Sequence, residues 1–144
     1  MNKKEFQTAK DQDRAKYITR PYEEIPLTAL VEGSNSHLVN TDQQTISFLT
    51  MKAGSSFAVH SHENEQVMIV IDGYCDEIID GKIYRVSKGD VIRLPPNVPH
   101  GAFLMEVDCQ AIDIFTPPRS DYLEMYQEQN PGQKMIFNGM GERD

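Results

Sequence analysis

The chain contains 144 residues, 39% of them hydrophobic and 25% charged, and its formal net charge at pH 7 is −8. That length predicts one domain with a substantial core. Phosphate binding requires concentrated Lys and Arg, so the acidic balance argues against a nucleic-acid partner. No apolar run approaches the roughly 18 residues of a membrane span, and residues 1–17 lack the apolar segment of a secretory signal. We therefore expect a cytoplasmic protein without a membrane partner.

The chain divides into three predicted parts. Residues 1–20 are polar and aperiodic and predict an N-terminal arm. Over residues 21–123, strand-like runs are separated by turn residues at a spacing of about 8–12, which favours an all-β sandwich or barrel. The runs are PLTALV, QTISFLTM, SFAVH, QVMIVI, YCDEII, KIYRV, DVIRL, GAFLMEV and CQAIDIF. Residues 124–144 form a C-terminal extension, whose apolar group at 135–137 is expected to pack back on the barrel.

Two Asp-Gly pairs, at 72–73 and 80–81, predict hairpins, because Gly tolerates a positive φ. The run QVMIVI is apolar at nearly every position. We expect the core to cover one of its faces and a second subunit the other, so the sequence predicts a homodimer. Cys75 and Cys109 fall within strand-like runs and are expected to be buried free thiols.

Two histidines lie close together in the stretch HSHENEQ, which runs from His60 to Gln66. On a strand, His60 and His62 would share a face. A sandwich can bring His100, in the segment PPNVPH, next to them. Three imidazoles and one further N or O donor suit a divalent transition metal with open positions. An HxH pair alone is more often an ordinary surface feature, so the surrounding pattern must decide.

The surrounding pattern resembles two motifs of the cupin family. GSSFAVHSHENEQVMIVIDG is similar to G-x5-H-x-H-x3-E-x6-G, with Gln66 in the place of the glutamate. GDVIRLPPNVPH is similar to the second motif, matching at Pro95 and His100. Asn97 stands there in the place of a glycine, and Leu104 in that of an asparagine. The resemblance covers about residues 40–120 and implies a cupin jelly-roll barrel, an all-β fold.

By this resemblance, the metal ligands are His60, His62, Gln66 and His100. Strand parity leaves Glu65 open as the fourth ligand, whereas the motif spacing favours Gln66. A glutamine ligand leaves the charge of a divalent metal uncompensated, which favours Lewis-acid chemistry over oxygen-dependent redox chemistry. The sequence does not distinguish Zn, Ni, Mn and Fe, all of which accept imidazole.

The segment after the second motif contains Asp113 and Arg119. Spacing alone allows Asp113 on a wet outer face, with Arg119 on a surface loop beside Asp121. However, D-x-F-x-P-x-R resembles the end of the barrel in cupins of pectin and alginate breakdown, which open the ring of 4,5-unsaturated uronates. The resemblance implies that Asp113 transfers protons, that Arg119 binds a substrate carboxylate and that Phe115 lines the pocket.

The functional hypothesis is therefore a metal-dependent isomerase- or lyase-type cupin that acts on a small acidic sugar or keto acid. Its partner would be an anionic small molecule. Three alternatives stay open: a cupin dioxygenase, a polyketide-cyclase-like cupin, and a non-enzymatic cupin that binds a metal or a sugar.

Overall fold

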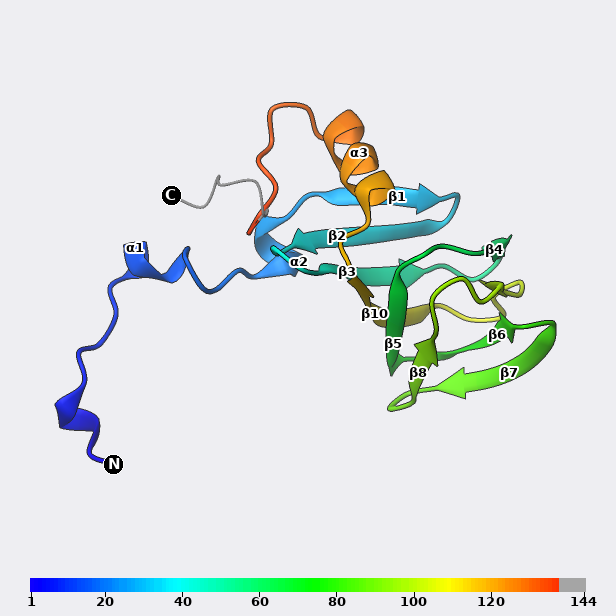
Figure 1. Ribbon diagram of the computed structural model, residues 1–144, viewed down its shortest axis with the longest axis horizontal. Coiled ribbons are helices and arrows are strands. Elements are labelled where there is room, and N and C mark those ends of the chain that lie inside the picture. The colour runs from blue at the N-terminus through cyan, green and yellow to red at the C-terminus, as the bar shows by residue number, and fades with distance from the viewer. Residues whose placement is uncertain (138–144) are drawn as a thin grey trace.

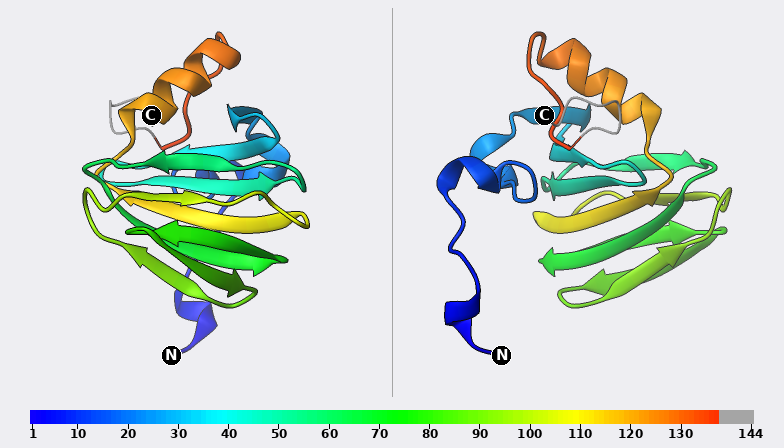
Figure 2. Two further views of the ribbon diagram at one scale, coloured as in Figure 1. Left: turned by 90° about the vertical axis from the view of Figure 1, so that its right-hand side faces the viewer. Right: turned by 60° about the vertical axis from the view of Figure 1, so that its left-hand side comes forward.

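The strands form two antiparallel sheets that face each other (Figure 1; Figure 2). The computed structural model describes residues 1–137. The sheet orders are β1-β2-β3-β10-β5-β8 and β4-β9-β6-β7. The strands are β1 (Leu27–Val31), β2 (Ser34–Asn40), β3 (Thr45–Met51), β4 (Phe57–His60), β5 (Glu65–Asp72), β6 (Tyr74–Ile79), β7 (Lys82–Ser87), β8 (Val91–Leu94), β9 (His100–Ala102) and β10 (Cys109–Thr116). This arrangement confirms the predicted all-β jelly-roll barrel.

Strand β10 lies in the middle of the larger sheet, between β3 and β5. Its side chains alternate in burial, so that Cys109, Ala111, Asp113 and Phe115 are buried and the residues between them are more exposed. This period of two places Asp113 on the same inner face as its apolar neighbours. The polar group therefore lies inside the barrel.

The interior of the barrel is mostly aliphatic, aromatic and sulfur-containing. The side chains at its centre include Leu38, Met51, Val70, Leu94, Cys109 and Phe115. Full burial of one such aliphatic or aromatic side chain contributes about 1.5–3 kcal/mol. Cys75 and Cys109 are both buried and free, as expected. The outward side chains of β5 are half-buried in the single chain, and the homodimer stays a prediction.

The two Asp-Gly pairs turn out differently. Asp80 and Gly81 have φ angles of 48° and 80° and join β6 to β7 in a hairpin, as predicted. The hairpin predicted at Asp72-Gly73 is wrong, because β5 and β6 belong to different sheets. At Gly73, with φ of 77°, a Cβ would overlap the carbonyl oxygen of Asp108, so the crossing between sheets requires glycine.

Strand β2 was not predicted. Its sequence, SNSHLVN, starts with small polar residues that are typical of turns. In the structure β2 pairs with β1 and β3, and the Ser36 hydroxyl is 2.6 Å from that of Ser47 inside the barrel. Pairing on both sides and the hydroxyl contact compensate for the weak strand preference of serine and asparagine.

Segments outside the barrel have different surroundings. Helices η1 (Lys3–Glu5) and α1 (Asp11–Arg14) lie in an arm that extends away from the barrel in Figure 1, and α2 (Pro21–Glu24) leads into β1. Helix α3 (Ser120–Gln129) continues past residue 123, where the barrel was expected to end, and contacts β1.

After α3 the chain returns to the barrel. Met135 is buried, and the amide of Asn40 donates to the carbonyl oxygen of Ile136 at 3.2 Å. This is the expected docking of the apolar group at 135–137. Residues 138–144 of the predicted extension lie outside the described residues. No helix in the described range 1–137 is long and apolar enough to cross a membrane.

Candidate metal centre

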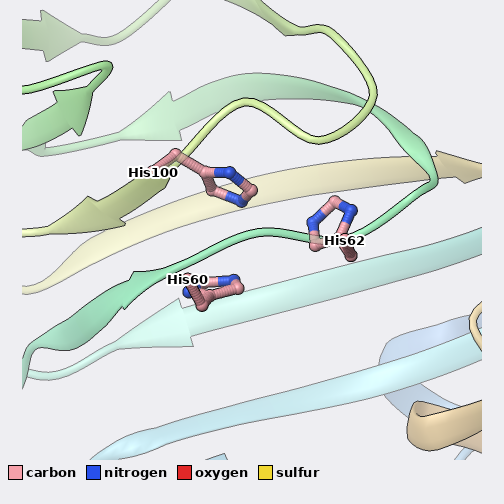
Figure 3. A group of neighbouring side chains, drawn as sticks. All are labelled: His60, His62 and His100. Atoms are coloured by element: carbon pink, nitrogen blue, oxygen red, sulfur yellow. The ribbon is translucent and has the colours of Figure 1, made fainter.

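Three histidines meet at one end of the barrel (Figure 3). His60 ends β4 and lies opposite His100, the first residue of β9, while His62 follows in the loop before β5. One ring nitrogen from each residue lies within 4.8 Å of the others. The predicted imidazole ligands are therefore brought together, although His62 is just beyond the strand on which it was expected.

Each imidazole is oriented by a backbone carbonyl close by in the chain. The Nδ1 atoms of His60, His62 and His100 lie 2.7, 3.0 and 2.9 Å from the carbonyl oxygens of Ala58, Asn64 and Val98. In a neutral imidazole, these contacts place the proton on Nδ1 and leave the Nε2 lone pair available. All three rings thus have the tautomer that binds a metal through Nε2.

Gln66 supplies a fourth donor beside His62. Its Oε1 is 3.2 Å from His62 Nε2. With the His62 proton on Nδ1, both of these atoms are lone-pair acceptors, and their proximity is unfavourable unless a cation lies beside them. A divalent metal resolves this conflict, so the donor set fits the predicted ligands.

Glu65 is excluded as the fourth donor by its position. Its side chain is 42% exposed and pairs with Arg93 at 3.0 Å, whereas Gln66 is buried inside the barrel. Successive residues of a strand point to opposite faces, so β5 can direct only one of the two side chains inward. Gln66, which the motif spacing favoured, is the one of the two that is buried inside the barrel.

The acid–base state of the histidines also suits a metal. Burial lowers the pKa of His100 to about 4 and that of His62 below its ordinary value, in both cases as the largest cause. Neutral imidazole is the form that coordinates metals, so these two rings need not lose a proton near pH 7. Three neutral imidazoles and an amide oxygen would suit a divalent transition metal.

Asp113 lies in the cavity beside this centre. The cavity has a volume of about 30 Å³, and its wall includes Asp113, His60, His100 and Arg119. Asp113 is buried, and its Oδ1 makes no hydrogen bond to the described residues. Burial raises the pKa of Asp113 to about 6, against the opposite effects of the Gln66 amide and the Arg119 guanidinium. The alternative of a wet outer face is therefore wrong for Asp113.

Arg119 combines features of both earlier interpretations. It pairs with Asp121, as the surface-loop alternative predicted, but its side chain is only 8% exposed and it lines the cavity. Phe115, predicted to line the pocket, is instead buried behind the wall. Its ring meets the ring of His62 edge to face at 5.7 Å. Tyr122, and not Phe115, is among the residues that line the cavity.

A family model for the cupin domain matches residues 47–115. The chain is also 30% identical to a solved RmlC-like cupin from Desulfovibrio desulfuricans, with a TM-score of 0.51, covering 57% of this chain and 80% of that one. The chain belongs to the cupin superfamily. This cupin is 36% identical to an H2HPP isomerase from Bacillus subtilis over 67 residues. The matched region covers 46% of this chain and 28% of the isomerase, so this chain spans just over a quarter of that relative's length.

Two further comparisons concern KdgF proteins. The cupin is 25% identical over 103 residues to the pectin degradation protein KdgF from Dickeya dadantii, covering 70% of this chain and 94% of the other. The solved structure of KdgF from Halomonas sp. has a TM-score of 0.63 and 27% identity, covering 69% of this chain and 92% of that one. Both relationships extend over nearly the whole of the related protein.

Two cavity residues of this cupin were not predicted as site residues. Glu77, on β6, is 5% exposed, and burial, followed by the charge of Asp113, raises its pKa to about 8. The alternation of YCDEII could have identified Glu77, since it shares a face with Cys75 and with the core. Tyr122 had no comparable signal, because α3 itself was not predicted.

Proposed function

We propose that this cupin is a metal-dependent isomerase that opens the ring of 4,5-unsaturated uronates to linear keto acids. The observation that carries the proposal is the buried carboxyl of Asp113, whose Oδ1 has no hydrogen-bond partner among the described residues and which lines a cavity with Arg119, His60 and His100. The relationship to a pectin degradation protein supports the same substrate class.

The reaction requires proton transfer and no oxidant. Breaking the anomeric O–H bond and the bond from the anomeric carbon to the ring oxygen creates an aldehyde. The ring oxygen and C5 become an enolate, which turns into a ketone when C4 gains a proton. Asp113 accepts the hydroxyl proton, and its pKa of about 6 is suited to a base that works near neutral pH.

Arg119 recognises the substrate carboxylate. Its guanidinium lines the cavity on the same side of the barrel as Asp113, and the two charges influence each other. A planar guanidinium can hold a carboxylate through paired N–H donors, which orients the sugar ring over the proton-transfer group.

The metal would be held by His60, His62, His100 and Gln66. When bound, a divalent ion with these neutral ligands supplies a positive charge that polarises substrate oxygens and steadies the developing enolate. The residues of the chain do the rest: Arg119 orients the substrate, and Asp113 moves the proton.

The test follows the conjugated alkene of 4,5-unsaturated galacturonate by its absorbance, using metal-loaded protein. We expect acceleration over buffer and a loss of about 10²–10⁴-fold in the Asp113→Asn variant, the usual contribution of a proton-transfer group. Asp80→Asn is the matched control, because Asp80 is exposed in the β6–β7 turn and asparagine tolerates its φ of 48°.

Three results would contradict the proposal. No acceleration by the wild-type protein rejects the reaction, and full activity in Asp113→Asn rejects the role of the carboxylate. Oxygen uptake during turnover would favour the dioxygenase alternative.

A further inference from the structure

We propose that Asp121 and Tyr122 are positioning residues that hold the Arg119 guanidinium in one orientation and so make the cavity selective for ligands with a carboxylate. This inference rests on the proposed function and deepens it, since it assigns the selectivity of the same site to two residues that do not belong to the metal centre.

Asp121 holds one edge of the guanidinium. Arg119 Nε and Nη2 donate to the two carboxylate oxygens of Asp121 at 3.0 and 2.6 Å. Guanidinium has five N–H donors, and this paired contact engages two of them. Nη1 takes no part in this ion pair.

Two aromatic rings contact the same guanidinium group. The guanidinium carbon of Arg119 lies 3.8 Å from the ring centre of Tyr122 and 4.9 Å from that of Phe115. The two rings meet edge to face, at 5.4 Å and 86°. Contacts of this kind are attractive and directional, so they restrict the plane of the guanidinium as well as its position.

The backbone beneath Arg119 is held by buried polar side chains from other elements. The Arg119 amide donates to Thr45 Oγ1 at 2.9 Å, and that hydroxyl donates in turn to Asn40 Oδ1 at 2.9 Å. Asn64 Nδ2 donates to the carbonyl oxygen of Pro117 at 2.6 Å. The backbone of the segment before α3 is therefore held at Pro117 and Arg119, and the Arg119 side chain is held by Asp121.

A purely structural ion pair would not require this arrangement. Asp121 keeps 55% of its side chain exposed, so it could pair with an arginine in solvent, yet the Arg119 side chain is 8% exposed. Burying a guanidinium costs free energy unless its donors are used. An anionic ligand in the cavity would use the remaining donors, and the unpartnered Asp113 Oδ1 on the same wall independently indicates that a ligand binds there.

The test compares binding of two unreactive sugars to metal-loaded protein by calorimetry. D-galacturonate and D-galactose share a ring, but only the first has a carboxylate. We expect Asp121→Asn and Tyr122→Leu to weaken galacturonate binding about tenfold, while galactose binding and metal content change less than twofold. With the unsaturated substrate, KM rises by a similar factor and kcat changes less.

One variant serves as the matched control. Glu124→Gln removes a carboxylate from an exposed position of the same helix. It is expected to bind galacturonate within twofold of the wild type. Should Tyr122→Leu fail to fold, Asp121→Asn carries the test.

The outcomes separate this inference from the function on which it rests. Wild-type selectivity for galacturonate that persists in Asp121→Asn and Tyr122→Leu overturns the inference and leaves the proposed function standing. A wild-type protein that neither turns over the uronate nor prefers galacturonate overturns the proposed function itself.

Discussion

The metal centre and the Arg119 segment are held in different ways. Each ligand histidine is oriented by a carbonyl oxygen only two residues away along the chain. Arg119 is held by Thr45, and its preceding prolines by Asn64, from positions 74 and 53 residues away. Local contacts orient each imidazole, and the pairing of β4 with β9 brings His60 and His100 together. The anion site, by contrast, exists only once β3, the β4–β5 loop and α3 have assembled.

Removing a metal ligand is the strongest way to test this comparison. We expect His62→Ala to lower metal affinity by more than about 100-fold, because even outer partners of metal ligands contribute 10–100-fold. A competition titration with a chromogenic chelator measures it. His37→Ala is the control, since His37 bonds to the Ile25 carbonyl outside the centre. Equal affinity in the two variants would exclude His62 from the site.

Glu77 is a buried carboxyl in the cavity wall, and its substitution tests whether its protonation makes the stability of the fold depend on pH. Its pKa of about 8 exceeds the ordinary value of 4.5, so folding takes up a proton and the free energy of unfolding falls as pH rises through this range. Glu77→Gln lacks this titration. Relative to wild type, the free energy of unfolding of this variant rises from pH 5 to pH 8, by at most about 5 kcal/mol.

Urea denaturation of metal-free protein at both pH values measures the effect of Glu77→Gln. Asp113 is present in wild type and variant alike, so the difference between their pH profiles reports Glu77 together with its interaction with Asp113. Parallel profiles would show that Glu77 is ionised in the folded barrel.

Asn64 contacts both regions, the metal centre through its backbone and the Arg119 segment through its side chain, so its substitution can affect one without the other. Its backbone carbonyl accepts from His62 Nδ1, whereas its side chain donates to Pro117. Asn64→Ala keeps the first contact and removes the second. We expect a loss of about 1–2 kcal/mol in stability and weaker galacturonate binding, with metal affinity unchanged. Calorimetry with metal and sugar in turn checks this, and a large loss of metal affinity would contradict the separation.

Much of the fold could be predicted from residue spacing, and the proposed metal ligands came from the resemblance to the cupin motifs. Alternation in β10 puts Asp113 on one face with Ala111 and Phe115, but only the structure shows that this face is the inner one. The hairpin at Asp80-Gly81 follows from its turn residues. The second Asp-Gly pair misled, because a glycine with positive φ serves both a hairpin and a crossing between sheets. Strand β2 escaped prediction because its pairing depends on neighbours from other parts of the chain.

Local periodicity thus determines which side chains share a face, and the resemblance to the cupin motifs singles out the three histidines and Gln66. Neither is sufficient for Arg119, whose loop could lie in solvent or under α3. Packing decided between these, since Tyr122 and Phe115 enclose the guanidinium and Thr45 holds its backbone. Contacts between residues far apart in the chain have no spacing to read, so only the folded barrel reveals the cavity in which Arg119 and Asp113 meet.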